Sequence, residues 1–254
     1  MPRTYIGFVF AFLAVVCSVS CPADQPSNGA TLTTRVSASE ESAADAQSKR
    51  VKQAKTRNLS ATAALQQLKR GNARFLTGAP RHPHETVTHR QLLENGQHPF
   101  AVVLGCSDSR VCPELVFDQG FGDLFVVRVA GNVVDTDVTA SIEYATDHLE
   151  TKLIVVMGHT GCGAVTATVD HLNNPDGEAA EVMQLLYQIE PAVITVDANL
   201  NRDERLSQSI ENNVRMAVRR LSRVPDLRAG VTERKLQIVG AIYDMHTGKV
   251  RFLD

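Results

Sequence analysis

The sequence predicts an α/β fold, with a mostly parallel central β-sheet flanked by helices and a C-terminal hairpin at the edge of the sheet. Two apolar runs, Phe100–Gly105 and Leu153–Gly158, have the length and composition of buried strands, and helical patterns lie between and after them. Sheets of this kind are built from repeated units of a strand, a crossover helix and a parallel strand. The chain has 254 residues, of which 43% are hydrophobic, so it is long enough to enclose a sizeable core.

Three segments are expected along the chain. Residues 1–21 combine Arg3, the apolar run Ile6–Val16 and small residues before Cys21, which is the pattern of an export signal. The favoured version is a bacterial lipoprotein signal with the lipid on Cys21, which would place the protein in the periplasm, anchored to the membrane. Ordinary secretion with cleavage near Cys21, or an uncleaved anchor, remain as alternatives. The apolar run is too short for a comfortable transmembrane helix.

Residues 22–57 are polar and lack apolar periodicity, so they are predicted to form a flexible linker. Residues 58–254 are predicted to form the folded domain. Its net charge favours no nucleic-acid partner, since the whole chain carries only −2. A loop at residues 81–98 contains four histidines, but its polar neighbours and Pro83 favour a solvated loop over a metal site.

The elements of the domain follow from capping residues and apolar spacing. Ser60 caps a first helix that places Leu65, Leu68 and Phe75 on one face. The long amphipathic helix near the C-terminus ends at Pro225. The remaining expected elements are helices over Thr88–Glu94, from Asp137 or Thr139, from Cys162 to His171, over residues 179–189 and over Asp203–Val224, a buried strand over Asp123–Val129, and strands over Lys235–Tyr243 and Val250–Leu253.

Candidate metal ligands follow the two apolar runs. Cys106 comes directly after the first run, and His159 and Cys162 follow the second. Carboxyl ends of parallel strands meet at one edge of a sheet, so we expect these three side chains to converge, with Gly161 and Gly163 permitting the tight turn around Cys162. Two thiolates and one imidazole suit zinc, and three protein ligands leave a fourth position for water.

Two simpler interpretations compete with a catalytic site: a closed structural zinc site, and two core thiols without a metal. Asp108 and Arg110 argue against both, because a carboxylate and a guanidinium beside an open metal serve to control a bound water. Asp108 is also a conditional fourth ligand. Cys112 is expected to be a packed thiol.

The motif Cys106-Ser-Asp-Ser-Arg110 together with His159-x-x-Cys162 resembles the β-class carbonic anhydrases. The helix Ala63–Phe75 is similar to the opening helix of that family, and Val239–Asp244 is similar to the first strand of its closing hairpin. The resemblance implies a zinc cofactor on Cys106, His159 and Cys162. It also implies a homodimer or a tetramer of dimers, with active sites near the dimer interface.

The resemblance also implies substrate-binding residues. Gln97 stands where the plant-like members of the family place a glutamine that hydrogen-bonds the substrate. Phe125 matches an aromatic wall of the pocket, and Tyr144 matches a pocket residue that comes across the dimer interface. Core packing is the alternative for Phe125 and Tyr144, and a loop amide facing water is the alternative for Gln97.

The expected activity is therefore a zinc-dependent lyase reaction, the reversible hydration of carbon dioxide to bicarbonate and a proton by zinc-bound hydroxide. One alternative is a hydrolase of the same fold that acts on COS or CS2. A second alternative, from another functional class, is a non-catalytic zinc-stabilised binding protein, which the presence of both Asp108 and Arg110 disfavours.

Overall fold

The computed structural model describes residues 59–173 and 178–253. The expected export signal (1–21) and linker (22–57) lie outside the described residues, so both stay predictions. Within the described ranges, no helix combines the length and the apolar character that crossing a membrane requires.

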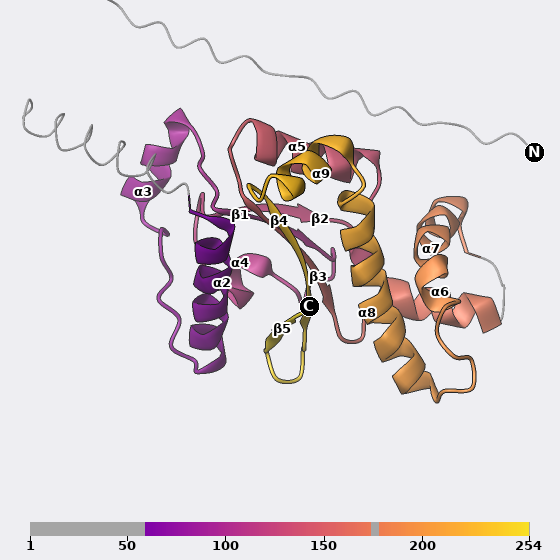
Figure 1. Ribbon diagram of the computed structural model, residues 1–254. Coiled ribbons are helices and arrows are strands. Elements are labelled where there is room, and N and C mark those ends of the chain that lie inside the picture. The colour runs from indigo at the N-terminus through magenta and orange to yellow at the C-terminus, as the bar shows by residue number, and fades with distance from the viewer. Residues whose placement is uncertain (1–58, 174–177, 254) are drawn as a thin grey trace, which may run out of the picture. The chain divides into compact units, whose positions relative to one another are not determined.

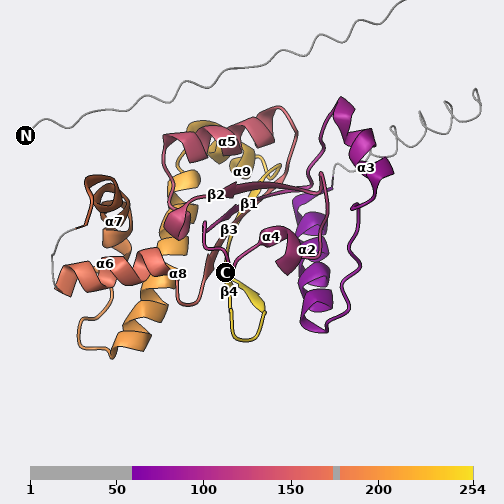
Figure 2. The same ribbon diagram turned by 180° about the vertical axis from the view of Figure 1, so that it is seen from behind.

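The centre of the domain is a five-stranded sheet with the strand order β2-β1-β3-β4-β5 (Figures 1 and 2). The four neighbours β2, β1, β3 and β4 are parallel, and β5 is antiparallel to β4. The predicted mostly parallel sheet with a C-terminal edge hairpin is therefore confirmed. The strands are β1 (Ala101–Gly105), β2 (Leu124–Arg128), β3 (Leu153–His159), β4 (Gln237–Tyr243) and β5 (Val250–Phe252).

Helices cover both faces of the sheet. Side chains alternate along β1 and β3, so that Val102 and Ile154 enter one apolar cluster while Val103 and Val155 enter the other. The first cluster includes residues of α5 to α9, and the second includes residues of α2 and α4. The helices are α2 (Ala61–Leu76), α3 (Val87–Leu92), α4 (Pro113–Val116), α5 (Thr136–Asp147), α6 (Gly163–Asn173), α7 (Ala180–Val193), α8 (Arg202–Leu221) and α9 (Pro225–Thr232), with short 3-10 turns η1 (Leu93–Asn95) and η2 (Ala130–Asn132).

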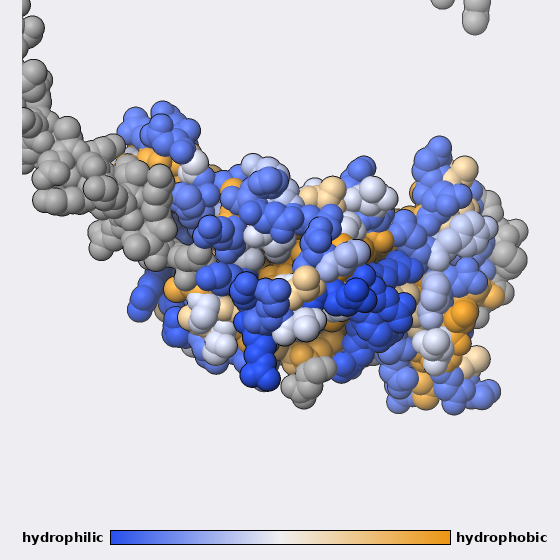
Figure 3. Space-filling view, turned by 45° about the horizontal axis from the view of Figure 1, so that its top comes forward, coloured by the Kyte–Doolittle hydropathy of each residue, from blue (hydrophilic) through white to orange (hydrophobic). Residues whose placement is uncertain are grey.

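Burial on both faces explains why β1 and β3 are continuous apolar runs in the sequence, because every residue of each strand is buried. The surface is correspondingly polar. Figure 3 shows one face of the molecule on which hydrophilic residues predominate and hydrophobic residues form small separate patches.

Three sequence-based expectations need correction. The strand around Asp123–Val129 was expected to be buried, but β2 is only partly buried and ends in an exposed Arg128, because it lies at the edge of the sheet. Pro225 does not only end a helix: it occupies the first turn of α9, where a missing N–H costs nothing. The helix expected over 179–189 continues to Val193 and includes Pro191.

The histidine-containing loop after α2 is more firmly attached than a solvated loop. The backbone N–H groups of Arg81 and His82 donate to Asp118, which is also paired with Arg74. His84 Nδ1 lies 2.7 Å from the buried Asp123 carboxylate. Two buried carboxylates therefore hold this loop against the turn that precedes β2.

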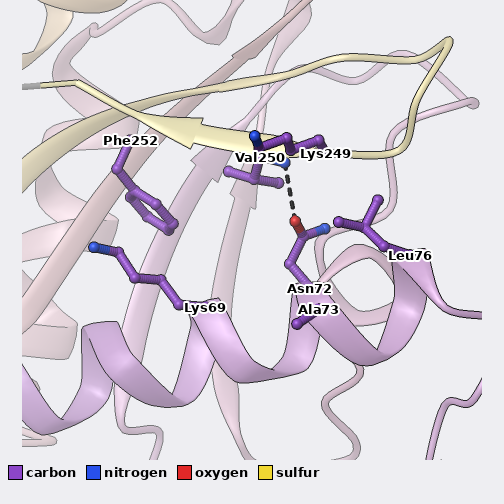
Figure 4. Close-up of a pocket in the computed structure, with 7 residues that line it drawn as sticks. All are labelled: Lys69, Asn72, Ala73, Leu76, Lys249, Val250 and Phe252. Atoms are coloured by element: carbon purple, nitrogen blue, oxygen red, sulfur yellow. Dashed lines mark hydrogen bonds between the residues drawn. The ribbon is translucent and has the colours of Figure 1, made fainter.

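Asn72 joins α2 to the C-terminal hairpin (Figure 4). It is 5% exposed, and its side-chain oxygen accepts the N–H of Val250 at 2.9 Å. Its amide nitrogen donates to the carbonyl oxygens of Val116 and Gly248 at 3.1 and 3.0 Å. One side chain thus satisfies three backbone groups from the end of α4 and from the hairpin.

The order of the strands determines where a site forms. The chain leaves β1 for β2 on one side and then returns past β1 to β3 on the other side. The switch point of the topology therefore lies between β1 and β3, and ligand sites of open α/β sheets form at the carboxyl ends of the strands flanking such a point.

Candidate metal centre

The three predicted ligands meet at this switch point. Cys106 is the residue directly after β1, His159 is the last residue of β3, and Cys162 directly precedes α6. Their exposed fractions are 4%, 0% and 1%. The turn between His159 and Cys162 depends on Gly161, whose φ is +64°. The φ of Gly163 is not positive, and a Cβ at this position would meet no other atom within 4 Å. The expectation that the turn also requires a glycine at position 163 is therefore wrong.

The distances within the cluster fit zinc. The ligand atoms of Cys106, His159 and Cys162 all lie within 4.8 Å of one another, and the two sulfur atoms are 3.9 Å apart. Two zinc–sulfur bonds of about 2.3 Å at a tetrahedral angle place the sulfurs about 3.8 Å apart. The spacing exceeds that of a disulfide, and both cysteines are free.

His159 has the tautomer that a metal ligand needs. Its Nδ1 is 3.1 Å from the carbonyl oxygen of Thr160, which makes Nδ1–H the donor. The other ring nitrogen, Nε2, is then a lone-pair acceptor. It is buried and has no hydrogen-bond partner among the described residues. A buried, unpartnered nitrogen facing two sulfurs is the arrangement that a metal would complete.

The two sulfur atoms of the cluster lie within hydrogen-bond distance of each other. The hydrogen bond between them lowers the pKa of Cys106 to about 4 and raises the pKa of Cys162. Backbone N–H groups favour both thiolates: those of Asp108 and Gly131 lower the pKa of Cys106, and those of Ala164 and Val165 act on Cys162. The backbone around the cluster therefore stabilises the thiolate form of the cysteines, which is the form that binds a metal.

Asp108 and Arg110 form a two-bonded ion pair beside the cluster. Arg110 Nε and a terminal nitrogen donate to the two carboxylate oxygens at 2.9 and 2.7 Å, and its backbone N–H donates at 3.0 Å. These hydrogen bonds from Arg110 hold the pKa of Asp108 well below its ordinary value. Arg110 also donates to the carbonyl oxygen of Gly161 at 3.3 Å, which links the two ligand-bearing loops.

One carboxylate oxygen of Asp108 also lies near the cluster. Its Oδ2 lies 3.9 Å from His159 Nε2, too far for a hydrogen bond but close to where a fourth ligand would sit. The predicted pairing of Asp108 with Arg110 next to the three ligands is thus present in the structure.

Comparison with known proteins identifies the family. The family model described as carbonic anhydrase matches residues 101–250. Carbonic anhydrase 2 of Mycobacterium tuberculosis is 40% identical over 199 residues, covering 78% of this chain and 95% of the relative. The chain belongs to the β-carbonic anhydrase family.

Solved β-carbonic anhydrases share the fold. The enzyme CafA of Aspergillus fumigatus aligns with a TM-score of 0.61 and 32% identity, covering 76% of this chain and 90% of CafA. Tetrameric β-carbonic anhydrases of Sordaria macrospora align with a TM-score of 0.60 and 30% identity, covering 73% and 94%. The family match begins at the first residue of β1 and ends at the first residue of β5, so it spans all three candidate ligands of this carbonic anhydrase.

The predicted pocket residues of this carbonic anhydrase come from β2, from α5 and from the loop before β1. Phe125 of β2 and Tyr144 of α5 contact each other, with ring centroids 6.4 Å apart, and Tyr144 is 49% exposed. Gln97 lies in the loop before β1 and is exposed. No hydrogen bond or ring contact joins any of the three to a ligand in the described residues, although Phe125 packs against the apolar cluster that includes Cys106 and Cys162. Their substrate role stays a prediction. Cys112 is partly buried and donates to Glu114, not to the cluster.

Sequence reasoning missed two supports of the carbonic anhydrase site. Arg128, at the end of β2, donates to the carbonyl oxygens of Cys106 and Asp108 at 3.0 and 2.6 Å. Gly131, in η2, donates its N–H to Cys106 Sγ at 3.3 Å. A charged residue directly after an apolar strand was the one local signal for Arg128.

Proposed function

We propose that this carbonic anhydrase catalyses the reversible hydration of carbon dioxide to bicarbonate and a proton, and that it depends on zinc held by Cys106, His159 and Cys162. The observation that carries the proposal is the unpartnered Nε2 of His159, which faces the two cysteine sulfurs. Asp108 lies beside these atoms and is ion-paired with Arg110. When bound, zinc lowers the pKa of a coordinated water toward neutrality and so supplies a nucleophile at ordinary pH.

The protein residues have separate roles in this proposal. The three ligands leave one position open, and burial of all three keeps bulk water away from the metal. Asp108 is held deprotonated by Arg110, so it accepts a hydrogen bond from the nucleophile and orients the nucleophile toward the carbon of CO2. A small apolar substrate needs few further charged groups, and the one other charge beside the cluster that the hydrogen bonds of the described residues show, Arg128, is engaged with the backbone carbonyls of Cys106 and Asp108.

Arg110 also decides what else Asp108 does. A carboxylate 3.9 Å from a metal-ligating nitrogen is close enough to become the fourth ligand after a small rotation. The two hydrogen bonds from Arg110 oppose that rotation. Asp108 is thus a conditional ligand, which occupies the open position when Arg110 releases it.

The proposed assembly is a homodimer or a tetramer of dimers. The outer edge of β2 has no strand partner in the described part of the chain, and an open edge favours pairing with another chain. Phe125 and Tyr144 lie at this edge. Tetrameric relatives support the proposal that a second copy brings Tyr144 toward a neighbour's site, where Gln97 and Phe125 bind the substrate.

The function is tested with Arg110→Ala and an exposed control arginine, Arg90→Ala. Zinc content and CO2 hydration are measured on the same preparations from mildly acidic to alkaline pH. The Arg110 variant is expected to keep about one zinc per chain while losing most activity, and the control to keep both. Near-native hydration by Arg110→Ala at all pH values would refute the gating role, and zinc-free active wild-type protein would refute the metal centre.

Substrate identity is tested with the same wild-type protein. Hydrolysis of COS or CS2 with little CO2 hydration would replace the proposal by a hydrolase of the same fold. Zinc binding without turnover of any of the three substrates would favour a non-catalytic zinc protein instead.

We also propose that residues 1–21 export the protein to the periplasm and that Cys21 carries a lipid. The support is the apolar run after Arg3 and the small residues before Cys21. A single acyl chain binds membranes only marginally, so stable attachment needs more than one. Mass spectrometry of the native protein tests this: an intact Met1 in soluble cytoplasmic protein would end the export proposal, and an unmodified N-terminus near Cys21 would end the lipid proposal alone.

A further inference from the structure

Asn213 is a buried polar residue in the apolar stripe of α8. It is 2% exposed and lies beside Ile210 and Val214, which face the core. Asparagine is a poor residue for a helix interior, and a buried amide is costly unless it is hydrogen-bonded. Asn213 therefore lowers the stability of α8 unless the contact that its side chain makes offsets this cost.

That contact is with the turn behind the metal centre. Asn213 Nδ2 donates to the carbonyl oxygen of Gly131 at 2.7 Å. Gly131 has a φ of +65°, and a Cβ there would lie 2.7 Å from Ile189, so the turn is closely packed and needs glycine. The N–H of the same Gly131 donates to Cys106 Sγ. A continuous path thus runs from the buried amide to a ligand atom.

Gly131 differs from the other amides that face the sulfurs. Those of Asp108, Ala164 and Val165 lie within three residues of the cysteine they act on, so the local turn positions them. Gly131 lies 25 residues from Cys106, and only tertiary contacts can hold it in place. Its backbone carbonyl has one side-chain donor among the described residues, and that donor is Asn213.

We propose that Asn213 is a positioning residue of the metal centre, which holds Gly131 so that one N–H stays on the Cys106 sulfur. The inference rests on the proposed zinc function. An N–H donated to a thiolate withdraws electron density from the sulfur and orients it. Two thiolates place much negative charge on one metal, and this N–H offsets part of that charge, as outer hydrogen bonds do in other metal sites.

The test compares Asn213→Leu with Asn212→Leu in the full-length protein. Asn212 is a matched control, because it too donates to a backbone carbonyl, that of Ala192, at 3.4 Å. Each protein is loaded with Co²⁺ for the sulfur-to-cobalt charge-transfer absorption, and with Zn²⁺ for the rate of loss to a chelator. Asn213→Leu is expected to shift the absorption to longer wavelength, because the sulfur becomes a stronger donor. It is also expected to lose zinc about 10-fold faster, because the Cys106 sulfur is no longer held in its orientation. Asn212→Leu should change neither.

The outcomes separate this inference from the proposed function. An unchanged absorption band in Asn213→Leu, or equal zinc loss in both variants, would overturn the role of Asn213 and leave the metal centre intact. A wild-type protein without any sulfur-to-cobalt band would overturn the metal centre and the inference with it. Should Asn213→Leu not fold, Asn213→Ser is measured instead, since its hydroxyl is too short to reach Gly131 and the same shift is expected.

Discussion

Replacing Asn72 by leucine should destabilise the domain strongly, although it removes no apolar contact. Asn72 is buried. Its side chain accepts the N–H of Val250 (Figure 4) and donates to the carbonyl oxygens of Val116 and Gly248. Leucine has a similar volume but bonds none of them. In the described residues, no other hydrogen bond between an α2 side chain and the backbone reaches α4 or the C-terminal hairpin.

The size of the effect follows from how these groups are buried. Gly248 is partly exposed, so its carbonyl can turn to water at little cost. Val116 and Val250 are buried, and each backbone group left unsatisfied there costs about 1–3 kcal/mol. The expected loss is therefore about 4 kcal/mol in the free energy of unfolding. For a domain of this size it lowers the Tm by roughly 8–16 °C.

Urea unfolding followed by circular dichroism measures this loss. Gln66→Leu is the control, because Gln66 is exposed on the same helix and exposed substitutions change stability by about 0.5 kcal/mol or less. Zinc and protein concentrations are kept equal, since both shift apparent stability. A difference between the two variants below about 1 kcal/mol would show that the hairpin finds other partners and that the accounting of Asn72 is wrong.

Three further outcomes are expected. Cys162→Ser should lose zinc and CO2 hydration together, whereas Cys112→Ser should keep both; retained zinc in the first would remove Cys162 from the ligand set. Zinc should slow the labelling of Cys106 and Cys162 by thiol reagents, and equal labelling with and without metal would contradict a thiolate-bound metal. Burial alone raises the pKa of Asp118, but hydrogen bonds from Arg81, Arg74 and His82 outweigh it and the pKa is lowered; its stabilisation is therefore complete above the unfolded pKa near 3.8 and is lost as the pH falls through the lower folded value. Asp118→Asn should be less stable than wild type at pH 7, with the difference in unfolding free energy narrowing below about pH 4, and a constant difference down to pH 2 would refute this.

The parts of the fold that were predictable from sequence have local causes. The strands β1 and β3 are apolar up to the ligand His159 because both faces of the sheet are covered. The ligands lie at or just after the carboxyl ends of those strands, so the topology of parallel strands alone brings them to one edge. The Asp108–Arg110 pair is likewise local, with its partners two residues apart.

The parts that were not predictable depend on contacts between distant residues. Asn213 lies 82 residues from the carbonyl it satisfies, and in the sequence it is only a polar interruption of an apolar stripe. Arg128 acts on a loop 20 residues earlier. The edge position of β2 follows from the strand order, which its own composition does not reveal. For α9, proline was taken as the end of one helix when it also begins the next.

The 56 residues that separate Cys106 from Cys162 have a consequence for folding. A metal held by both side chains would close this long segment of chain, as a cross-link does. If the proposed zinc binds the folded chain and not the unfolded one, free zinc at about 100 times its dissociation constant adds about 2.7 kcal/mol to stability. Under the proposed zinc function, the availability of zinc where the protein folds therefore affects the fraction of chains that are folded, apart from the turnover rate of each folded molecule.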